Sequence, residues 1–423
     1  MAVIVQKYGG SSVADADAIK RVAKRITEAR RAGDDVVVVV SAMGDPTDEL
    51  IGLANQVTPL PPEREMDILL TAGERISMAL LAMAIANLGF KAQSFTGQQA
   101  GVITDDSHGK ARIVAVKADR ITSALQDGNV AIVAGFQGVN ASNDVTTLGR
   151  GGSDTTAVAM AAAIKADVCE IYTDVDGVFT ADPRIVPSAR KIGRISYEEM
   201  LDMAASGAKV LNLRCVEYGR RHGVDIHVRS SFSAHTGTLV TDRPAEGEGL
   251  MEQPLIAGVA HDRSEAKITV VGVPDVPGTA ARIFEVVAAA GVNIDMIVQN
   301  VSAAATGLTD ISFTLPATDG QAAMDALAAH EGEIQHASLQ YDDQIGKLSL
   351  VGAGMKSHPG VSAKLFGALR DAGINIEMIS TSEIRVSVVT RADQLDDAVR
   401  AVHTAFDLDS ENGEAIVYGG TGR

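Results

Sequence analysis

Three short runs of apolar residues predict strands that are buried on both faces. They are AVIV at 2–5, VVVVV at 36–40 and VAIVAGF at 130–136. Continuous apolar runs of this length are typical of parallel strands that helices cover on both sides. The segment DADAIKRVAKRITEARRAG at 15–33 has helical spacing, because its apolar residues return every three or four positions. The pattern predicts an α/β fold with a largely parallel sheet sandwiched by helices.

The same pattern continues further along the chain. It predicts an alanine-rich helix at 155–166, a strand entering a turn within 169–184 and an amphipathic helix at 198–211. Glycine-bearing segments follow the strands directly, at 7–12 (KYGGSS), 41–48 (SAMGDPTD) and 135–138 (GFQG). Because ligands gather at the carboxyl ends of parallel strands, we expect these segments to form one binding edge.

The C-terminal part of the chain contains an internal repeat. Residues 241–253 (TDRPAEGEGLMEQ) break the periodicity with Gly, Pro and polar residues, which indicates a domain boundary. Beyond it, 270–297 resembles 350–379, with Pro-Gly, Phe and Gly-x-Asn-Ile in the same order. A single Pro-Gly is an ordinary turn, but recurrence in register favours two copies of a small module. We predict an N-terminal domain at 1–248, a linker at 249–264, and modules at 265–342 and 343–423, with exchange of strands between the modules left open.

Composition narrows the functional class. Of 423 residues, 46% are apolar and 22% charged, which is typical of a globular protein of several domains. The net charge of −17 disfavours nucleic acid and anionic membranes as partners. The two cysteines, Cys169 and Cys215, form no CxxC pair, so neither a disulfide framework nor a zinc site is indicated. We find no signal peptide or apolar run long enough to cross a bilayer, and expect a cytoplasmic protein.

Several segments could form binding or catalytic sites, and each could also have a purely structural role. KYGGSS could cradle a phosphate at a helix start beside Lys7, or simply cap a helix. The hydroxyl groups of Ser41 and Thr47 could donate hydrogen bonds to a ligand, or the two residues could simply lie in a surface loop. Glu74 and its neighbour Arg75 could belong to a site, or could be solvated charges. The run GRGGSDTTA at 149–157 favours a site, since an Arg among glycines is an uncrowded fork for a carboxylate or phosphate.

Other catalytic classes lack their signatures. There is no HExxH, no Gly-x-Ser-x-Gly and no Walker A sequence, and neither cysteine has the surroundings of a nucleophile. The carboxylates at 173–184 (TDVDGVFTADPR) do not have EF-hand spacing, so no metal site is predicted from the chain itself.

Taken in order, the motifs resemble those of the aspartokinases, a family of the amino-acid kinase superfamily. The matching segments are KYGGSS (7–12), SAMG (41–44), TAGE (71–74), GFQG (135–138), GRGGSDTTA (149–157), TDVDGVFTADPR (173–184) and AKVL (208–211). The two repeats resemble ACT domains, which have a βαββαβ arrangement, and SAMGDPTDEL with VAGFQGV looks most like the actinobacterial type. One departure follows AKVL, where this chain reads NLRCVEYG and many members carry His-Pro, so we carry over no roles beyond Lys209.

The resemblance implies transfer of a phosphoryl group from Mg²⁺·ATP to the side chain of aspartate. A carboxylate is already ionised at neutral pH, so the reaction needs no general base, which fits the absence of an obvious catalytic histidine. The catalytic residues implied are Lys7, which would neutralise charge on the phosphoryl group, and Asp154, which would organise Lys7. The residues implied for aspartate are Ser41, Thr47, Glu74, Arg150 and Ser153. Those implied for the nucleotide are Lys7, Gly9, Gly10, Ser11, Thr173, Asp174, Asp182, Arg184 and Lys209.

The resemblance also implies regulation. Enzymes of this type open the pathways to lysine, threonine and methionine through diaminopimelate and homoserine, and lysine with threonine would inhibit by feedback. The effector residues implied are Asp275, Gly278, Ala280, Gln299 and Asn300 in the first module, and Ser362, Thr381, Ser382 and Glu383 in the second module or its interface. We expect a homodimer or larger assembly, or one with a small subunit started internally near Met251.

Two other functions remain open on the sequence alone. One is a kinase for another acidic amino acid, such as glutamate or acetylglutamate, because such enzymes share the sheet and the lysine-glycine cradle. The other is a non-catalytic sensor, in which the repeats bind amino acids and the N-terminal domain is inactive. The presence of Lys7 and Asp154 counts against the sensor.

Overall fold

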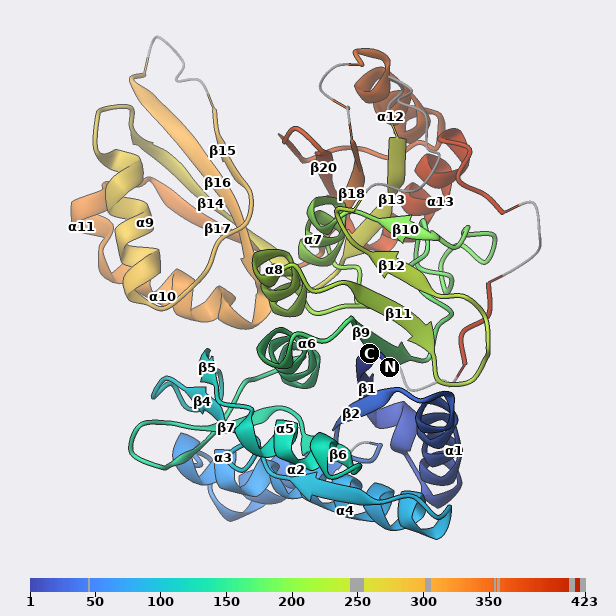
Figure 1. Ribbon diagram of the computed structural model, residues 1–423. Coiled ribbons are helices and arrows are strands. Elements are labelled where there is room, and N and C mark those ends of the chain that lie inside the picture. The colour runs from blue at the N-terminus through green and yellow to red at the C-terminus, as the bar shows by residue number, and fades with distance from the viewer. Residues whose placement is uncertain are drawn as a thin grey trace.

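The computed structural model describes the chain except for residues 45, 244–254, 301–305, 354, 356–357, 411–414 and 419–423. Figure 1 shows the N-terminal domain in the lower part of the molecule and the two C-terminal modules above it, the first on the left and the second on the right.

The N-terminal domain contains twelve described strands and eight α-helices. Its strands are β1 (Val3–Tyr8), β2 (Asp35–Val40), β3 (Ala92–Phe95), β4 (Val102–Thr104), β5 (Ile113–Val116), β6 (Val130–Ala134), β7 (Gln137–Val139), β8 (Val145–Thr147), β9 (Val168–Thr173), β10 (Arg194–Ile195), β11 (Ile226–Ser230) and β12 (Thr238–Val240). Its helices are α1 (Ala16–Ala32), α2 (Pro46–Val57), α3 (Glu63–Leu70), α4 (Ala72–Asn87), α5 (Asp119–Gln126), α6 (Gly152–Ile164), α7 (Tyr197–Ala205) and α8 (Leu213–His222).

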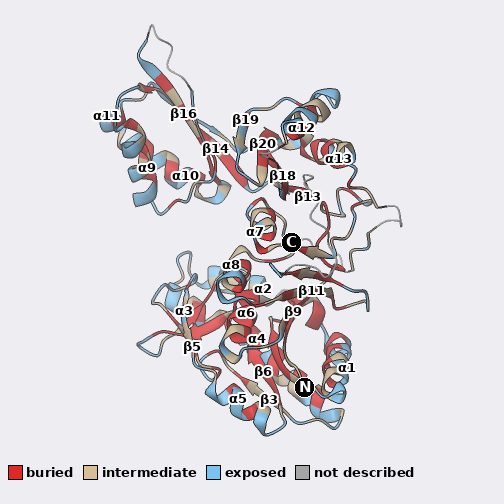
Figure 2. Cartoon of the chain, turned by 45° about the horizontal axis from the view of Figure 1, so that its top comes forward, coloured by how far each residue is buried: buried red, intermediate tan, exposed pale blue. Residues whose placement is uncertain are grey.

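The central sheet has the order β10-β12-β11-β9-β1-β2-β6-β3, and within it only β11 and β12 pair antiparallel among the described strands. Helices α1 and α4 pack on one face, while α5 to α8 pack on the other. Figure 2 shows the strands between these layers as buried. The arrangement confirms the predicted α/β fold. In the register of the sheet Tyr8 lies opposite both Val40 and Tyr172, so the carboxyl ends of β1, β2 and β9 meet at one edge.

The helix predicted at 198–211 is shorter than expected. It begins at Tyr197 and ends at Ala205, because Gly207 takes a φ of 103° that terminates the helical path. A Cβ at Gly207 would lie 2.1 Å from the carbonyl oxygen of His261, so the glycine also permits close contact with the C-terminal half.

The first module is a complete βαββαβ unit. Its elements are β14 (Glu265–Pro274), α9 (Thr279–Ala289), β15 (Ile297–Gln299), β16 (Leu308–Pro316), α10 (Gly320–Ala329), α11 (Glu331–Ile334) and β17 (Ser338–Asp342). Its sheet has the order β15-β16-β14-β17.

The second module repeats the plan with one strand replaced. Its elements are β18 (Ile345–Ala353), α12 (Gly360–Asp371), β19 (Met378–Thr381), β20 (Arg385–Arg391) and α13 (Leu395–Ala405). The glycines that follow α9 and α12, Gly291 and Gly373, have φ angles of 75° and 72°, so the same left-handed turn occurs in both copies.

The predicted linker at 249–264 is wrong for residues 255–262. They form β13 (Leu255–Asp262), which pairs with β18 and completes the second module's sheet in the order β13-β18-β20-β19. The second module therefore takes its fourth strand from a segment that precedes the first module. The chain after α13 instead returns to the N-terminal domain, where Asp409 and Val417 form single bridges with Ala189 and Val175.

The two modules contact each other through reciprocal ion pairs. Lys347, which is 1% exposed, lies 2.5 Å from Asp295 and also pairs with Glu265. Lys267 pairs with Glu377 in return. Because Lys267 and Asp295 occupy the positions in the repeat that Lys347 and Glu377 occupy in its second copy, the contact is approximately two-fold symmetric.

One helical run corrects an expectation from the sequence. Within the described residues, Glu63–Asn87 is long and apolar enough to cross a membrane by length and composition, although we predicted that no segment would be. A buried helix of a globular core passes the same test. One face of α4 packs against α1, β3 and β6, with Met78, Leu81 and Ile85 buried, while the opposite face of the run is exposed.

Candidate functional site

The site lies where β1, β2, β6 and β9 end, and its centre is a buried ion pair. Lys7 near the end of β1 is 6% exposed, and Asp154 in the first turn of α6 is 7% exposed. Their atoms Nζ and Oδ1 are 2.6 Å apart. Burying two charges this deeply costs desolvation free energy, so such a pair is more typical of a functional site than of a structural core. The ion pair also fixes where the ammonium group points.

The backbone beside Lys7 forms a tight turn. Gly10–Val13 are a single 3₁₀ turn, and a Cβ at Gly10 would lie 2.9 Å from the carbonyl oxygen of Gly44. The helical segment predicted at 15–33 is confirmed as α1, which begins at Ala16, where the Asp15 side chain accepts from the backbone N–H groups of Asp17 and Ala18. The N–H groups nearest Lys7 therefore belong to the turn at 9–11.

Glu74 lies in the first turn of α4 and reaches the loop after β2. Its Oε1 accepts a hydrogen bond from the backbone N–H of Ala42, next to Ser41, at 3.2 Å. Its Oε2 is buried and has no hydrogen-bond partner among the described residues. Burial raises the pKa of Glu74 to about 7. An unpaired buried carboxylate oxygen is suited to a cationic ligand group. Thr47, which the sequence placed in the same loop, lies in the first turn of α2.

The glycine-rich loop connects β8 to α6. Gly149 and Gly151 have φ angles of 76° and 70°, which glycine adopts without strain, and the Arg150 side chain between them is exposed. Ser153 is 8% exposed and packs on the backbone that follows β6, because a Cβ at Gly135 would lie 2.8 Å from its Oγ. The loop thus leaves the Arg150 guanidinium accessible, and the buried Ser153 directly precedes Asp154 in the chain.

Besides Lys7 and the turn at 9–11, the residues predicted for the nucleotide lie in two further places. Thr173 ends β9 and donates to Asp174, whose Oδ2 is 3.7 Å from Arg184. Asp182 accepts from the backbone N–H of Arg184, so these four residues form one loop. Lys209 is exposed and lies in the connection between α7 and α8.

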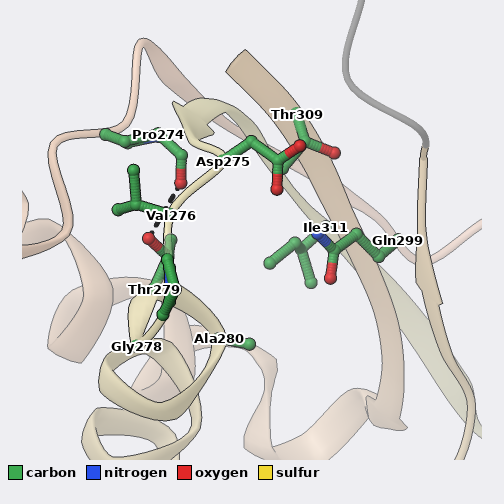
Figure 3. Close-up of a pocket in the computed structure, with 10 residues that line it drawn as sticks. Pro274, Asp275, Val276, Gly278, Thr279, Ala280, Gln299, Thr309 and Ile311 are labelled. Carbon is green, nitrogen blue, oxygen red and sulfur yellow. Dashed lines mark hydrogen bonds between the residues drawn. The ribbon is translucent and has the colours of Figure 1, made fainter. Parts of the chain in front are cut away.

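The first module contains a pocket of about 350 Å³, which Figure 3 shows. It brings together four of the residues predicted to bind an effector, Asp275, Gly278, Ala280 and Gln299. Asn300, the fifth, is not among the lining residues, and its backbone N–H donates to Asp310. The carboxylate of Asp275 and the amide of Gln299 face the cavity from opposite sides (Figure 3).

The effector residues predicted in the second module lie on two different elements. Ser362 is in the first turn of α12, whereas Thr381, Ser382 and Glu383 lie at the turn between β19 and β20. All four are exposed. Met251, the predicted internal start, lies outside the described residues.

The sequence analysis missed residues that hold the glycine-rich loop. Asn212 and Arg214 at the start of α8 donate to backbone carbonyls of this loop. Phe136 has a φ of 69°, which is unusual for a non-glycine residue, and it packs beneath Gly152. Apart from the departure of 212–219 from the family pattern, no local signal marks these residues, because they act through backbone atoms that are distant in sequence.

Comparison with known proteins gives consistent matches along the whole chain. The amino acid kinase family matches residues 2–230, and the ACT domain matches 268–330 and 348–406. An aspartokinase of Mycolicibacterium smegmatis is 62% identical over 424 aligned residues, covering all of both chains, and one of Corynebacterium glutamicum is 59% identical with the same coverage.

Solved structures agree with these matches. The E. coli aspartokinase III in complex with aspartate and ADP has a TM-score of 0.82 at 25% identity, covering 96% of this chain and all of that one. The same enzyme in complex with lysine and aspartate has a TM-score of 0.70 at 25% identity, covering 95% of this chain and 99% of that one.

Proposed function

The chain belongs to the aspartokinase family, and on that premise we propose which of its residues carry the reaction and what regulates it. As an aspartate kinase it phosphorylates aspartate, and we place the acceptor carboxylate beside the buried Lys7–Asp154 pair. The observation that carries this proposal is the 2.6 Å ion pair at the edge of the sheet, with an unpaired oxygen of Glu74 at the same edge.

Lys7 supplies positive charge where negative charge develops. As the γ-phosphoryl group passes from ATP to the carboxylate, its oxygens carry the charge of the transition state, and a fixed ammonium group stabilises them. Asp154 holds this ammonium in place. The N–H groups of Gly10 and Ser11 and the Ser11 hydroxyl bind phosphate oxygens, while the N–H of Gly9 donates to the carbonyl of Tyr172 and Gly9 lets the backbone approach the phosphate closely.

The aspartate substrate lies between charged groups of opposite sign. Arg150 binds its α-carboxylate as a two-pronged fork, helped by the hydroxyls of Ser41, Thr47 and Ser153. Glu74 accepts the α-ammonium group through the oxygen that has no partner in the described residues.

The nucleotide binds on the β9 side of Lys7. Thr173, Asp174, Asp182 and Arg184 contact it from one loop, and Lys209 from the α7–α8 connection. Mg²⁺ would arrive with ATP, where it would neutralise charge on the phosphate oxygens and take most of its ligands from them and from water.

The specificity for aspartate is tested by ADP release from Mg²⁺·ATP with aspartate, glutamate or acetylglutamate as acceptor. We expect kcat/KM for aspartate to exceed that for either alternative by at least a hundredfold, since one added methylene group or a blocked ammonium disrupts a site of fixed charges. Preference for glutamate or acetylglutamate would contradict the assignment of Arg150 and Glu74 to aspartate.

The pH dependence of aspartate binding tests the role of Glu74. Its pKa of about 7 means that the free enzyme carries protonated Glu74 below pH 7, whereas the substrate ammonium requires the ionised form. We expect the KM for aspartate to rise about tenfold per unit as pH falls below 7, and to be flat above it. The Glu74→Gln variant should have a high KM for aspartate that does not change with pH in this range. If the KM of that variant still rose below pH 7 as in the wild type, Glu74 would not be the group that binds the substrate ammonium.

The same raised pKa affects stability with a definite sign. Because the folded pKa lies above the ordinary value of 4.5, the contribution of Glu74 is favourable below pH 4.5 and is lost as pH rises through 7. Glu74→Gln should therefore be more stable than the wild type at pH 8 and similar to it at pH 4, as measured by urea unfolding.

We propose that lysine and threonine inhibit the enzyme by feedback and that an effector binds in the first-module pocket. The support is the convergence of Asp275 and Gln299 on that cavity, together with the lysine complex of the E. coli relative. The product serves the pathways to lysine, threonine and methionine through diaminopimelate and homoserine. The residues Ser362, Thr381, Ser382 and Glu383 are proposed to complete an effector site across an interface.

Changing Asp275 tests the regulatory pocket. We expect Asp275→Ala to raise the concentration of lysine plus threonine needed for half inhibition by about tenfold or more, because it removes a charged hydrogen-bonding partner, with uninhibited kcat unchanged. The matched control is Asp325→Ala, an exposed carboxylate on α10 of the same module. If Asp275→Ala and Asp325→Ala were inhibited at the same effector concentration, the pocket at Asp275 would not be the effector site.

We also propose a cytoplasmic enzyme that assembles as a homodimer or larger oligomer, with a separate small subunit started near Met251 as the alternative partner. Strand β17, at the outer edge of the first module's sheet and largely exposed, favours association between chains. An immunoblot against the C-terminal half distinguishes the two assemblies, since an internal start would add a second, shorter band.

A further inference from the structure

Helix α8 has no part in the function proposed above, yet its first residues contact the glycine-rich loop directly. Figure 1 shows α8 lying alongside α6, and the two helices pack together. The start of α8 thereby faces the segment 148–151, which comes just before α6.

Asn212 performs two tasks with its two side-chain atoms. Its Oδ1 accepts from the backbone N–H of Arg214 and caps α8. Its Nδ2 donates to the carbonyl oxygen of Arg150 at 3.2 Å. The contact is close, because a Cβ at Gly151 would lie 2.3 Å from that Nδ2.

Arg214 joins the glycine-rich loop to a second segment. One guanidinium nitrogen donates to the carbonyl of Leu148 at 2.7 Å, and another donates to the carbonyl of Ala111 at 2.9 Å. Leu148 and Ala111 are buried, so these carbonyls would lose a partner if the guanidinium were removed. The planar guanidinium holds its donors in a fixed geometry that matches these two carbonyls, which the flexible ammonium group of a lysine does not.

The far side of the loop is fixed independently. Asp67, which is fully buried, accepts from the backbone N–H of Gly109 and from the Thr147 hydroxyl, and pairs with His108. The segment around residue 109 in turn abuts the loop, since a Cβ at Gly149 would lie 3.1 Å from the Gly109 carbonyl oxygen. The backbone on either side of Arg150 is therefore held, while its side chain is exposed.

From these contacts we propose that Asn212 and Arg214 are positioning residues for aspartate. They fix the backbone at 148–151, which glycine alone would leave free, so that the Arg150 guanidinium meets the substrate carboxylate without a loss of backbone entropy on binding. This proposal rests on the proposed function, in which Arg150 binds aspartate.

Steady-state kinetics with three single variants tests the proposal. Arg214→Met should lower kcat/KM for aspartate about a hundredfold and Arg214→Lys about tenfold, since lysine retains charge but reaches one carbonyl. Asn212→Ser should lower it about tenfold, because serine still caps the helix but is too short to reach Arg150. In each variant we expect the change in the KM for aspartate, with the KM for ATP within twofold of the wild type. The control is Arg221→Met, an exposed arginine on the same helix, which should match the wild type.

A double-mutant cycle separates positioning from general support of the fold. If Arg214 acts through Arg150, then Arg214→Met in an Arg150→Ala background should cause less than a twofold further change in kcat/KM. If Arg214→Met does not fold, the same cycle is run with Arg214→Lys. Additive effects, or equal rises in the KM for ATP and aspartate, would overturn the proposal. Failure of the proposed function is distinct, because then the wild type itself would not phosphorylate aspartate.

Discussion

Replacement of Lys7 by alanine should lower kcat about a thousandfold, with the KM values for ATP and aspartate changed much less. The ammonium group is buried and fixed by Asp154, so no water or neighbouring side chain takes its place when charge develops on the phosphoryl group. An effect confined to the transition state appears in kcat. Initial rates at saturating Mg²⁺·ATP and aspartate measure this loss. The matched control is Lys20→Ala, a solvated lysine on α1 that should retain full activity.

This variant also leaves the Asp154 carboxylate buried without its partner, which destabilises the fold. The double variant Lys7→Ala with Asp154→Asn removes both charges and should regain most of the lost stability while remaining inactive. Thermal unfolding and kcat are therefore compared for the single and double variants. If the double variant were active, the ion pair would be structural and the assignment of Lys7 would be wrong.

Replacement of Arg150 by alanine should raise the KM for aspartate about a hundredfold and leave the KM for ATP unchanged. A guanidinium that binds a carboxylate through two parallel hydrogen bonds contributes more than a single bond, and a charge-assisted bond alone accounts for about a tenfold effect or more. The KM of Arg150→Lys for aspartate should lie between those of the wild type and Arg150→Ala, about tenfold above the wild type, because an ammonium group cannot form the two parallel hydrogen bonds of a guanidinium.

The control for Arg150 lies at the edge of the same site. Arg75 follows Glu74 in α4 but is exposed, and Arg75→Ala should have a KM for aspartate within twofold of the wild type. If Arg150→Ala instead raised the KM for ATP, the glycine-rich loop would belong to the nucleotide and not to the amino acid.

The sequence predicted the parts of this structure that depend on local pattern. The apolar run at 36–40 lies in β2 and most of the run at 130–136 forms β6, which ends at Ala134, because a strand between two helical layers has to be apolar on both faces. The glycine turns of the repeats were equally recognisable, since Gly291 and Gly373 both adopt a left-handed conformation. The glycine turn in GRGGSDTTA was recognisable for the same reason, because Gly149 and Gly151 also have positive φ angles, whereas its role as a binding site stays a prediction.

What the sequence did not predict depends on partners that are distant along the chain. Strand β13 pairs with β18, which lies about 90 residues further along the chain. A pairing this distant produces no recognisable pattern in the sequence around β13. The contacts of Asn212 and Arg214 go to backbone carbonyls, which every residue possesses, so no particular side chain at 148–150 reveals them. The unpaired oxygen of Glu74 is likewise a property of burial and not of residue type.

The measurement that tests the central claim most directly is ATP-dependent formation of aspartyl hydroxamate, which traps the acyl phosphate product. The reaction is run on the full-length protein with aspartate and Mg²⁺, alone and with lysine plus threonine, beside the Lys7→Ala variant. We predict hydroxamate that requires ATP and aspartate, is lost in Lys7→Ala and is suppressed by the two amino acids. Hydroxamate at the wild-type rate in Lys7→Ala, or none in the wild type despite binding of lysine or threonine, would contradict the account.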